Sequence, residues 1–149
     1  MIVVDSNVIA YCWINGDRTA LAHRLRKLDP DWHAPVLWRS ELRNILTGYR
    51  RDGSLDESQV RQIMAAAATA LAGREHYLPS DRVFAVTEAS RLSAYDAEFV
   101  ALAQILGAPL VTEDRAIVRA FPRIAASLEA AIEDHWNACG TRSGRSHAG

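Results

Sequence analysis

The sequence predicts an α/β protein with a doubly wound, mainly parallel sheet flanked by helices, and three observations support that fold class. Short apolar runs alternate with longer segments of helical periodicity, the order expected when helices connect parallel strands. The first run, Ile2–Val4, is β-branched without polar alternation, as in a strand buried on both faces. Of the 149 residues, 49% are apolar, which is enough for one domain with a sizeable core.

The elements of the first half are bounded by turn residues and marked by apolar stripes. Leu21, Leu25 and Leu28 share one face of a helix, and Asn15-Gly16 is a turn before it. We expect strands over 2–4 and Trp32–Ala34, and helices over Val8–Trp13, Arg18–Leu28, Val36–Arg51 and Asp56–Leu71.

The second half continues the alternation. Gly73 and Gly107 suit helix ends, and Pro122 breaks the segment before it. We expect strands over His76–Leu78, Pro109–Val111 and Ile124–Ala125, and helices over Asp81–Leu92, Asp96–Leu106, a short segment ending at Phe121, and Ser127–Trp136. Residues 1–137 then form one domain, and the small and polar residues of 138–149 form a flexible C-terminal tail.

Charge and composition exclude several classes of protein. The formal net charge is −1, so a polyanion must be held by a local patch or by metal ions. Cys12 and Cys139 lack the spacing of a structural zinc site, and with no signal peptide they predict a cytoplasmic location. No run of 18 apolar residues occurs, so we expect no membrane span.

Four carboxylates lie where the predicted elements should converge. Asp5 and Asp114 each follow an apolar strand. Glu41 borders the apolar stripe of its helix, and Asp96 lies on an inward-facing side of the next-to-last long helix. Each also has a local explanation: Asp5 and Asp114 can cap helices, Ser93-x-x-Asp96 resembles a capping box, and Glu41 can pair with a surface Arg.

Together the four acids point to a cation site. Carboxylates crowded at one place repel one another and raise each other's pKa unless cations lie between them. Oxygen ligands without nearby His or Cys suit Mg²⁺ or Mn²⁺. Such ions can activate water and stabilise the attacking and leaving oxygens when a phosphodiester is cleaved.

Four short motifs produce a family resemblance. They are Asp5-Ser6-Asn7 after the first strand, Glu41-Leu42-x-Asn44 on a helix, Tyr95-Asp96-Ala97 at a helix start, and Thr112-Glu113-Asp114 after a late strand. In this order and at these separations, residues 1 to about 136 resemble the PIN domain family, and within it the VapC-type ribonuclease toxins of bacterial toxin–antitoxin pairs. The resemblance implies a five-stranded parallel sheet in three α/β/α layers, with an acidic pocket that binds Mg²⁺ or Mn²⁺.

The resemblance also implies site residues, an activity and partners. By matching position, the catalytic, metal-binding residues are Asp5, Glu41, Asp96 and Asp114, and the supporting residues are Asn7, Asn44, Thr112 and Glu98. Many relatives carry a small or apolar residue where Glu98 stands. The implied activity is cleavage of single-stranded RNA regions by metal-activated water, leaving 5′-phosphates. The implied partners are the RNA substrate, a cognate antitoxin covering the acidic groove, and a second copy in a homodimer.

RNA binding requires positive charge near the acids. The candidate RNA-binding arginines are Arg39, Arg43 and Arg50 on one flank of a helix, and Arg115 after the fourth acid. The alternative is that these arginines belong to solvated surfaces with acidic neighbours.

Other classes with acidic pockets fit less well. A phosphoacceptor receiver domain needs a lysine at a late strand end, but the only lysine is Lys27, in an early helix. A haloacid-dehalogenase phosphatase needs a second acid where Asn7 stands. Two alternatives stay open: a housekeeping RNA-processing nuclease without an antitoxin, and a catalytically inactive PIN-fold binding module.

Overall fold

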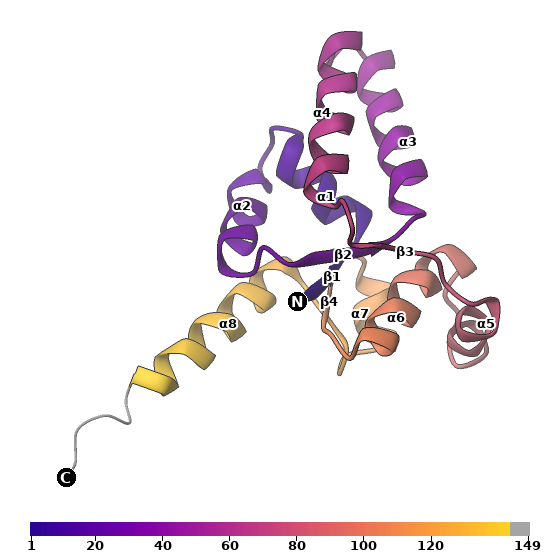
Figure 1. Ribbon diagram of the computed structural model, residues 1–149, viewed down its shortest axis with the longest axis vertical. Coiled ribbons are helices and arrows are strands. Elements are labelled where there is room, and N and C mark those ends of the chain that lie inside the picture. The colour runs from indigo at the N-terminus through magenta and orange to yellow at the C-terminus, as the bar shows by residue number, and fades with distance from the viewer. Residues whose placement is uncertain (144–149) are drawn as a thin grey trace.

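The computed structural model describes residues 1–143, in which a five-stranded sheet is covered by helices on both faces (Figure 1). The strands are β1 (Ile2–Val4), β2 (Trp32–Pro35), β3 (Glu75–His76), β4 (Leu110–Val111) and β5 (Ala125–Ala126). They are all parallel, in the order β3-β2-β1-β4-β5. The predicted fold class, a parallel sheet between two helical layers, is therefore confirmed.

The order of the strands reverses between β1 and β4. From β1 the chain moves outward to β2 and β3, and then returns to place β4 on the other side of β1. Val3 lies opposite Leu110 in this central pair. In open α/β sheets, ligands bind outside the carboxyl ends of the strands at such a switch point. Asp5 directly follows β1 and Thr112 directly follows β4, so both lie at that position.

Of the eight helices in the described chain, seven cover the two faces of the sheet. On one face lie α1 (Ser6–Trp13), α2 (Thr19–Leu28), α3 (Trp38–Arg51) and α4 (Glu57–Ala70), and on the other α5 (Ser80–Glu88), α6 (Ala94–Leu106) and α7 (Arg115–Ala120) (Figure 1). The last helix, α8 (Leu128–Ser143), packs against α2 and extends away from the body (Figure 1). None of the helices within residues 1–143 combines the length and apolar character needed to cross a membrane.

The two helical layers enclose separate hydrophobic clusters. Trp38 and Leu42 are fully buried in the first, and Phe99 is almost fully buried in the second. Successive residues of β1 divide between them: Val4 belongs to the first cluster and Val3 to the second, both at 0% exposure. Burial on both faces is what the unbroken apolar run of this strand predicts.

Two predicted boundaries on the third strand and the fifth helix are wrong. β3 lies at Glu75–His76 instead of His76–Leu78, because pairing with the end of β2 sets its position and leaves Tyr77 88% exposed. The helix predicted to reach Leu92 ends at Glu88. The Ser90 hydroxyl, which donates to the Val86 carbonyl and accepts from the amide of Leu92, holds the chain after that end.

The final helix is longer than predicted. We expected it to end at Trp136, but α8 continues to Ser143, through the first half of the segment 138–149 that was predicted as a tail. No proline interrupts these residues, and a single glycine such as Gly140 costs a helix only about 1 kcal/mol. The remainder of the predicted tail, residues 144–149, lies outside the described residues.

Candidate active site

A cavity of about 450 Å³ opens at the carboxyl ends of β1 and β4. We call it the acidic pocket because all four candidate acids line it: Asp5, Glu41, Asp96 and Asp114. Two of them follow the central strands, one comes from α3 on one face of the sheet, and one from α6 on the other. No Arg, Lys or His is found among the described residues that line it.

Asp5 is held in place at the bottom of the pocket by two short hydrogen bonds. It is only 7% exposed and is the N-cap of α1, where one carboxylate oxygen accepts from the amide of Ser6 at 2.6 Å. The other oxygen accepts from the hydroxyl of Thr112 at 2.6 Å. Asp5 therefore caps a helix, as the sequence suggested, and its carboxylate also lines the pocket.

Ser6 connects the first acid to the second. Its hydroxyl donates to the carboxylate of Glu41 at 2.9 Å, across 35 positions of sequence. Ser6 itself is 3% exposed, and its contact with Glu41 is partly buried. One residue therefore orients two acids, its amide binding Asp5 and its hydroxyl binding Glu41.

The other two acids are positioned by helix starts. Asp114 is the N-cap of α7 and accepts from the amides of Ala116 and Ile117 at 2.7 and 3.2 Å. Its own amide donates to the Thr112 hydroxyl at 3.0 Å. Asp96 lies in the first turn of α6, where its amide donates to the hydroxyl of the N-cap, Ser93, at 3.1 Å. The cap half of the predicted Ser93-x-x-Asp96 box is thus present.

Burial raises the pKa of Asp5 above its ordinary value. The hydrogen bonds from Thr112 and Ser6 oppose this shift, while repulsion from Asp96 and Asp114 adds to it. The repulsion shows that charges far apart in sequence act on one another at this carboxylate. In the absence of a cation, part of the negative charge in the pocket is therefore disfavoured.

Burial also raises the pKa of Glu41 and of Asp96. Hydrogen bonds from neighbouring serine hydroxyls oppose both shifts. Asp5 and Asp96 repel Glu41, and Asp114 repels Asp96, which raises the two pKa values further. These three acids thus share one electrostatic condition: each is buried or partly buried and close to like charges, and none is paired with a cation of the described residues.

The supporting residues divide between the pocket and its surroundings. Asn7 and Asn44 line the pocket, and Thr112 lies behind it as the hydrogen-bond partner of Asp5. Glu98 is not among the lining residues, but it repels Glu41, and burial raises its own pKa. Glu98 therefore lies close to the pocket without forming part of its wall.

The candidate RNA-binding arginines occupy different environments. Arg39 donates two hydrogen bonds to Glu75 at 2.5 and 2.9 Å and lies over the ring of Trp38. Arg43 donates along its own helix to the Arg39 carbonyl. Arg50 is exposed on α3, and Arg115 lines a second cavity beside the acidic pocket.

Sequence reasoning missed the roles of Ser6 and Glu113. Glu113 lies between two site residues, yet its carboxylate accepts from the amide of Leu128 at 2.7 Å and pairs with Arg18. The sequence offered one indication of the role of Ser6, which was its position directly after Asp5. The partners of Glu113 are 15 and 95 positions distant, so no local pattern could have indicated them.

The donor set of the pocket suits a hard divalent cation. Carboxylate oxygens from four segments face one cavity, and no positively charged side chain among its described lining residues neutralises them. Among residues 1–143 no three His, Cys, Asp or Glu side chains stand close enough to enclose an ion. Mg²⁺ usually retains several waters and takes only a few carboxylates, so an open acidic pocket fits its coordination.

Comparison with known proteins identifies the family of the chain. The family model described as the PIN domain matches residues 2–125. The chain belongs to the PIN domain family.

Two known proteins are similar to this chain over most of its length. Ribonuclease VapC3 of Pyrobaculum aerophilum is 28% identical over 126 residues, covering 83% of this chain and 96% of that protein. The crystal structure of PAE2754 from Pyrobaculum aerophilum matches with a TM-score of 0.71 at 19% identity, covering 91% of this chain and 89% of that one. The first agrees with the recognised VapC-type resemblance, and the second shows the fold.

Proposed function

We propose that the protein is a divalent-metal-dependent endoribonuclease, the toxin of a toxin–antitoxin pair, which hydrolyses phosphodiester bonds in single-stranded regions of RNA. One observation carries the proposal: four carboxylates from distant segments line one cavity of a PIN domain, with no cationic side chain among the described residues around it. The similarity to a protein named Ribonuclease VapC3 supports both the activity and the toxin role.

In this proposal Asp5, Glu41, Asp96 and Asp114 hold Mg²⁺ or Mn²⁺. A divalent ion bound there supplies Lewis-acid chemistry, lowering the pKa of water and offsetting the charge of a phosphodiester. The remaining work belongs to the protein. Its carboxylates must be ionised and fixed, and the two hydrogen bonds to Asp5 favour its charged form against the effect of burial.

The polar groups around the acids would orient the RNA. Asn7 and Asn44 line the pocket and carry amide donors that suit phosphate or ribose oxygens. Ser6 keeps Glu41 directed to the pocket through its hydroxyl. In the proposed reaction a water oxygen forms a bond to phosphorus, the bond from phosphorus to the 3′ oxygen breaks, and the 5′-phosphate stays on the downstream fragment.

Asp96→Asn is the most direct test. This residue lines the pocket, and the hydrogen bond found for it among the described residues is local, to Ser93, so the fold should tolerate an amide there. We expect the purified protein to cleave a panel of single-stranded RNAs only with Mg²⁺ or Mn²⁺, and the variant to lose at least about 100-fold in kcat, or about 2.7 kcal/mol of transition-state stabilisation.

The matched control is Asp134→Asn, the same chemical change on an exposed position of α8. It should cleave RNA as the parent protein does. Full metal-dependent cleavage by a folded Asp96→Asn variant would overturn the assignment of the pocket. Cleavage by the parent protein that continues in EDTA would overturn the metal dependence.

Two proposed partners follow from the VapC-type similarity. An antitoxin would inhibit cleavage by covering the acidic pocket, and the chain would form a homodimer. A short open reading frame directly upstream whose product inhibits cleavage supports the toxin role, in contrast to a housekeeping nuclease. Sedimentation equilibrium of the purified chain measures the oligomeric state, and a monomer at micromolar concentration would contradict the homodimer.

A further inference from the structure

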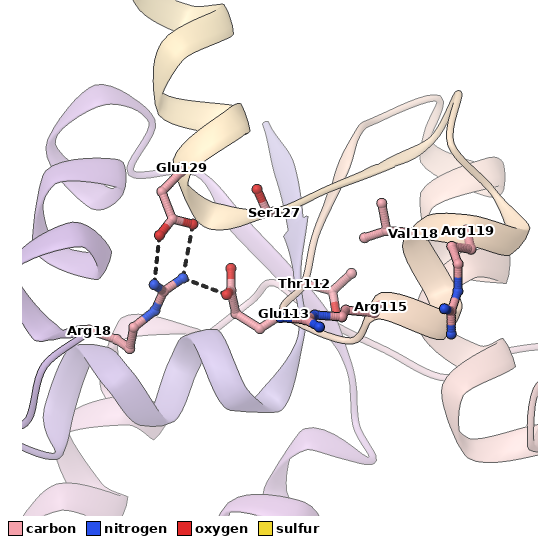
Figure 2. A pocket seen from close by; sticks show the side chains of 8 residues that line it. All are labelled: Arg18, Thr112, Glu113, Arg115, Val118, Arg119, Ser127 and Glu129. Carbon is pink, nitrogen blue, oxygen red and sulfur yellow. Dashed lines mark hydrogen bonds and ion pairs between the residues drawn. The ribbon is translucent and has the colours of Figure 1, made fainter.

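A second cavity, of about 470 Å³, lies beside the acidic pocket, because Glu113 and Arg115 in its wall flank Asp114 in the wall of the acidic pocket. Figure 2 shows the side chains that line this second cavity. We call it the α7 cavity, because residues of α7, the start of α8 and the loop before α2 enclose it. Thr112 lines it, and the hydroxyl of this residue binds both Asp5 and the amide of Asp114 in the acidic pocket. The side chain of Thr112 therefore links the wall of the α7 cavity to two acids of the acidic pocket.

In the α7 cavity, Glu113 and Glu129 neutralise the charge of Arg18. Figure 2 shows Arg18 held between Glu129 and Glu113. Arg18 donates to the two oxygens of Glu129 at 2.6 and 2.9 Å, and also pairs with Glu113. The other oxygen of Glu113 accepts from the amide of Leu128. Both carboxylates are therefore bound within the protein. Because Glu113 and Glu129 neutralise Arg18, this arginine does not attract an anionic ligand.

Arg115 and Arg119 are the remaining cations of the cavity. They lie four positions apart on α7, so their side chains project from one face of the helix. Both are exposed, and no ion pair to either is found within the part of the chain that the structure describes. With three arginines and two glutamates, the charged residues that line the cavity sum to +1, whereas the charged residues that line the acidic pocket are all acidic.

A guanidinium group binds phosphate oxygens through paired N–H donors, so two free arginines on one face form a suitable phosphate site. A strand of RNA passing through the acidic pocket carries further phosphates on either side of the reacting one. We propose that the α7 cavity binds a backbone phosphate that flanks the cleaved bond, with Arg115 and Arg119 as its ligands. This inference rests on the proposed function.

The test compares cleavage kinetics of the parent protein with the double variant Arg115→Ala/Arg119→Ala on a 12-nucleotide single-stranded RNA. We expect KM to rise about tenfold or more, as for loss of charge-assisted hydrogen bonds, while kcat changes by less than about threefold. The slope of log(kcat/KM) against log[salt] should become shallower by roughly 0.7, the value for one phosphate contact on single strands.

Two further variants separate charge from general damage. Arg115→Lys/Arg119→Lys keeps both charges and should recover most of the KM. Arg24→Ala/Arg61→Ala removes two charges from exposed positions outside both cavities and should leave KM and the salt slope unchanged. The effect should be similar for RNAs of different sequence, because a phosphate contact does not read bases.

Unchanged KM and salt slope in Arg115→Ala/Arg119→Ala would overturn the inference while the proposed function stands. An equal rise in KM in the Arg24→Ala/Arg61→Ala control would also overturn it, since the effect would then be one of net charge. Loss of inhibition by an acidic protein partner with normal RNA kinetics would assign the cavity to that partner instead. Failure of the parent protein to cleave any RNA refutes the proposed function itself, which is a separate result.

Discussion

Replacing Thr112 by valine should lower the stability of the metal-free protein. Thr112 is completely buried, and its hydroxyl donates to Asp5 at 2.6 Å while it accepts from the amide of Asp114 at 3.0 Å. Valine keeps the shape of the side chain but removes both hydrogen bonds. Asp5 then remains buried with one partner fewer, and a partly buried amide loses its acceptor.

The expected cost follows from these two contacts. A hydrogen bond to a charged group contributes about 1.5–3 kcal/mol, and an amide left without an acceptor costs about 1 kcal/mol. Together they predict a loss of about 2–4 kcal/mol in the free energy of unfolding, or a Tm lower by about 6–12 °C for a chain of this size. The pKa of Asp5 should rise further, because the Thr112 bond opposes the effect of burial.

Thermal unfolding followed by circular dichroism in EDTA measures the effect. Thr112→Ser is the matched control, because it keeps the hydroxyl and loses one methyl group. A Tm of Thr112→Val within about 1 °C of the parent protein would refute the reasoning, since that shift corresponds to well under 1 kcal/mol. A Thr112→Ser variant that melts as low as Thr112→Val would assign the loss to packing.

Three other predictions concern the ion pairs and the metal. The pKa of Glu75 is lowered by its bonds to Arg39, so the stability it contributes is present above its ordinary value near 4.5 and is lost as pH falls through the lowered pKa. Glu75→Gln should therefore lower the urea midpoint at pH 7, and the difference from the parent protein should shrink as the pH falls below 4.5. Mg²⁺ at about 100 times its Kd should stabilise the parent protein by about 2.7 kcal/mol and Asp96→Asn by much less, measured as a shift in Tm. Glu113→Ala removes the acceptor of the Leu128 amide, so hydrogen exchange at the start of α8 should accelerate; unchanged exchange would contradict this anchoring role.

The layered sheet could be predicted because its signals are local. An unbroken apolar run predicted burial of β1 on both faces, and Val3 and Val4 are indeed buried in opposite clusters. β3 was misplaced because two paired residues suffice for this strand, and its partner determines which two they are. The end of α8 was misjudged because weak helix formers can extend a helix that has already begun.

The acids of the pocket could be named from sequence, but their supports could not. Asp5 and Asp114 proved to be both helix caps and pocket residues, so the local interpretation and the functional one were compatible. The contact from Ser6 to Glu41 depends on tertiary packing across 35 positions. Arg39 looked like a free cation on a helix flank, and only the fold shows that Glu75 binds it.

The order in which the acids occur along the chain has a consequence during translation. Asp5 and Glu41 leave the ribosome early, but the pocket also needs Asp96 and Asp114. In addition, β4 must insert beside β1 before Asp5 and Asp114 can approach each other. A nascent or prematurely terminated chain that stops before position 114 therefore has an incomplete acidic pocket, and any chemistry that needs all four acids arises only late in synthesis.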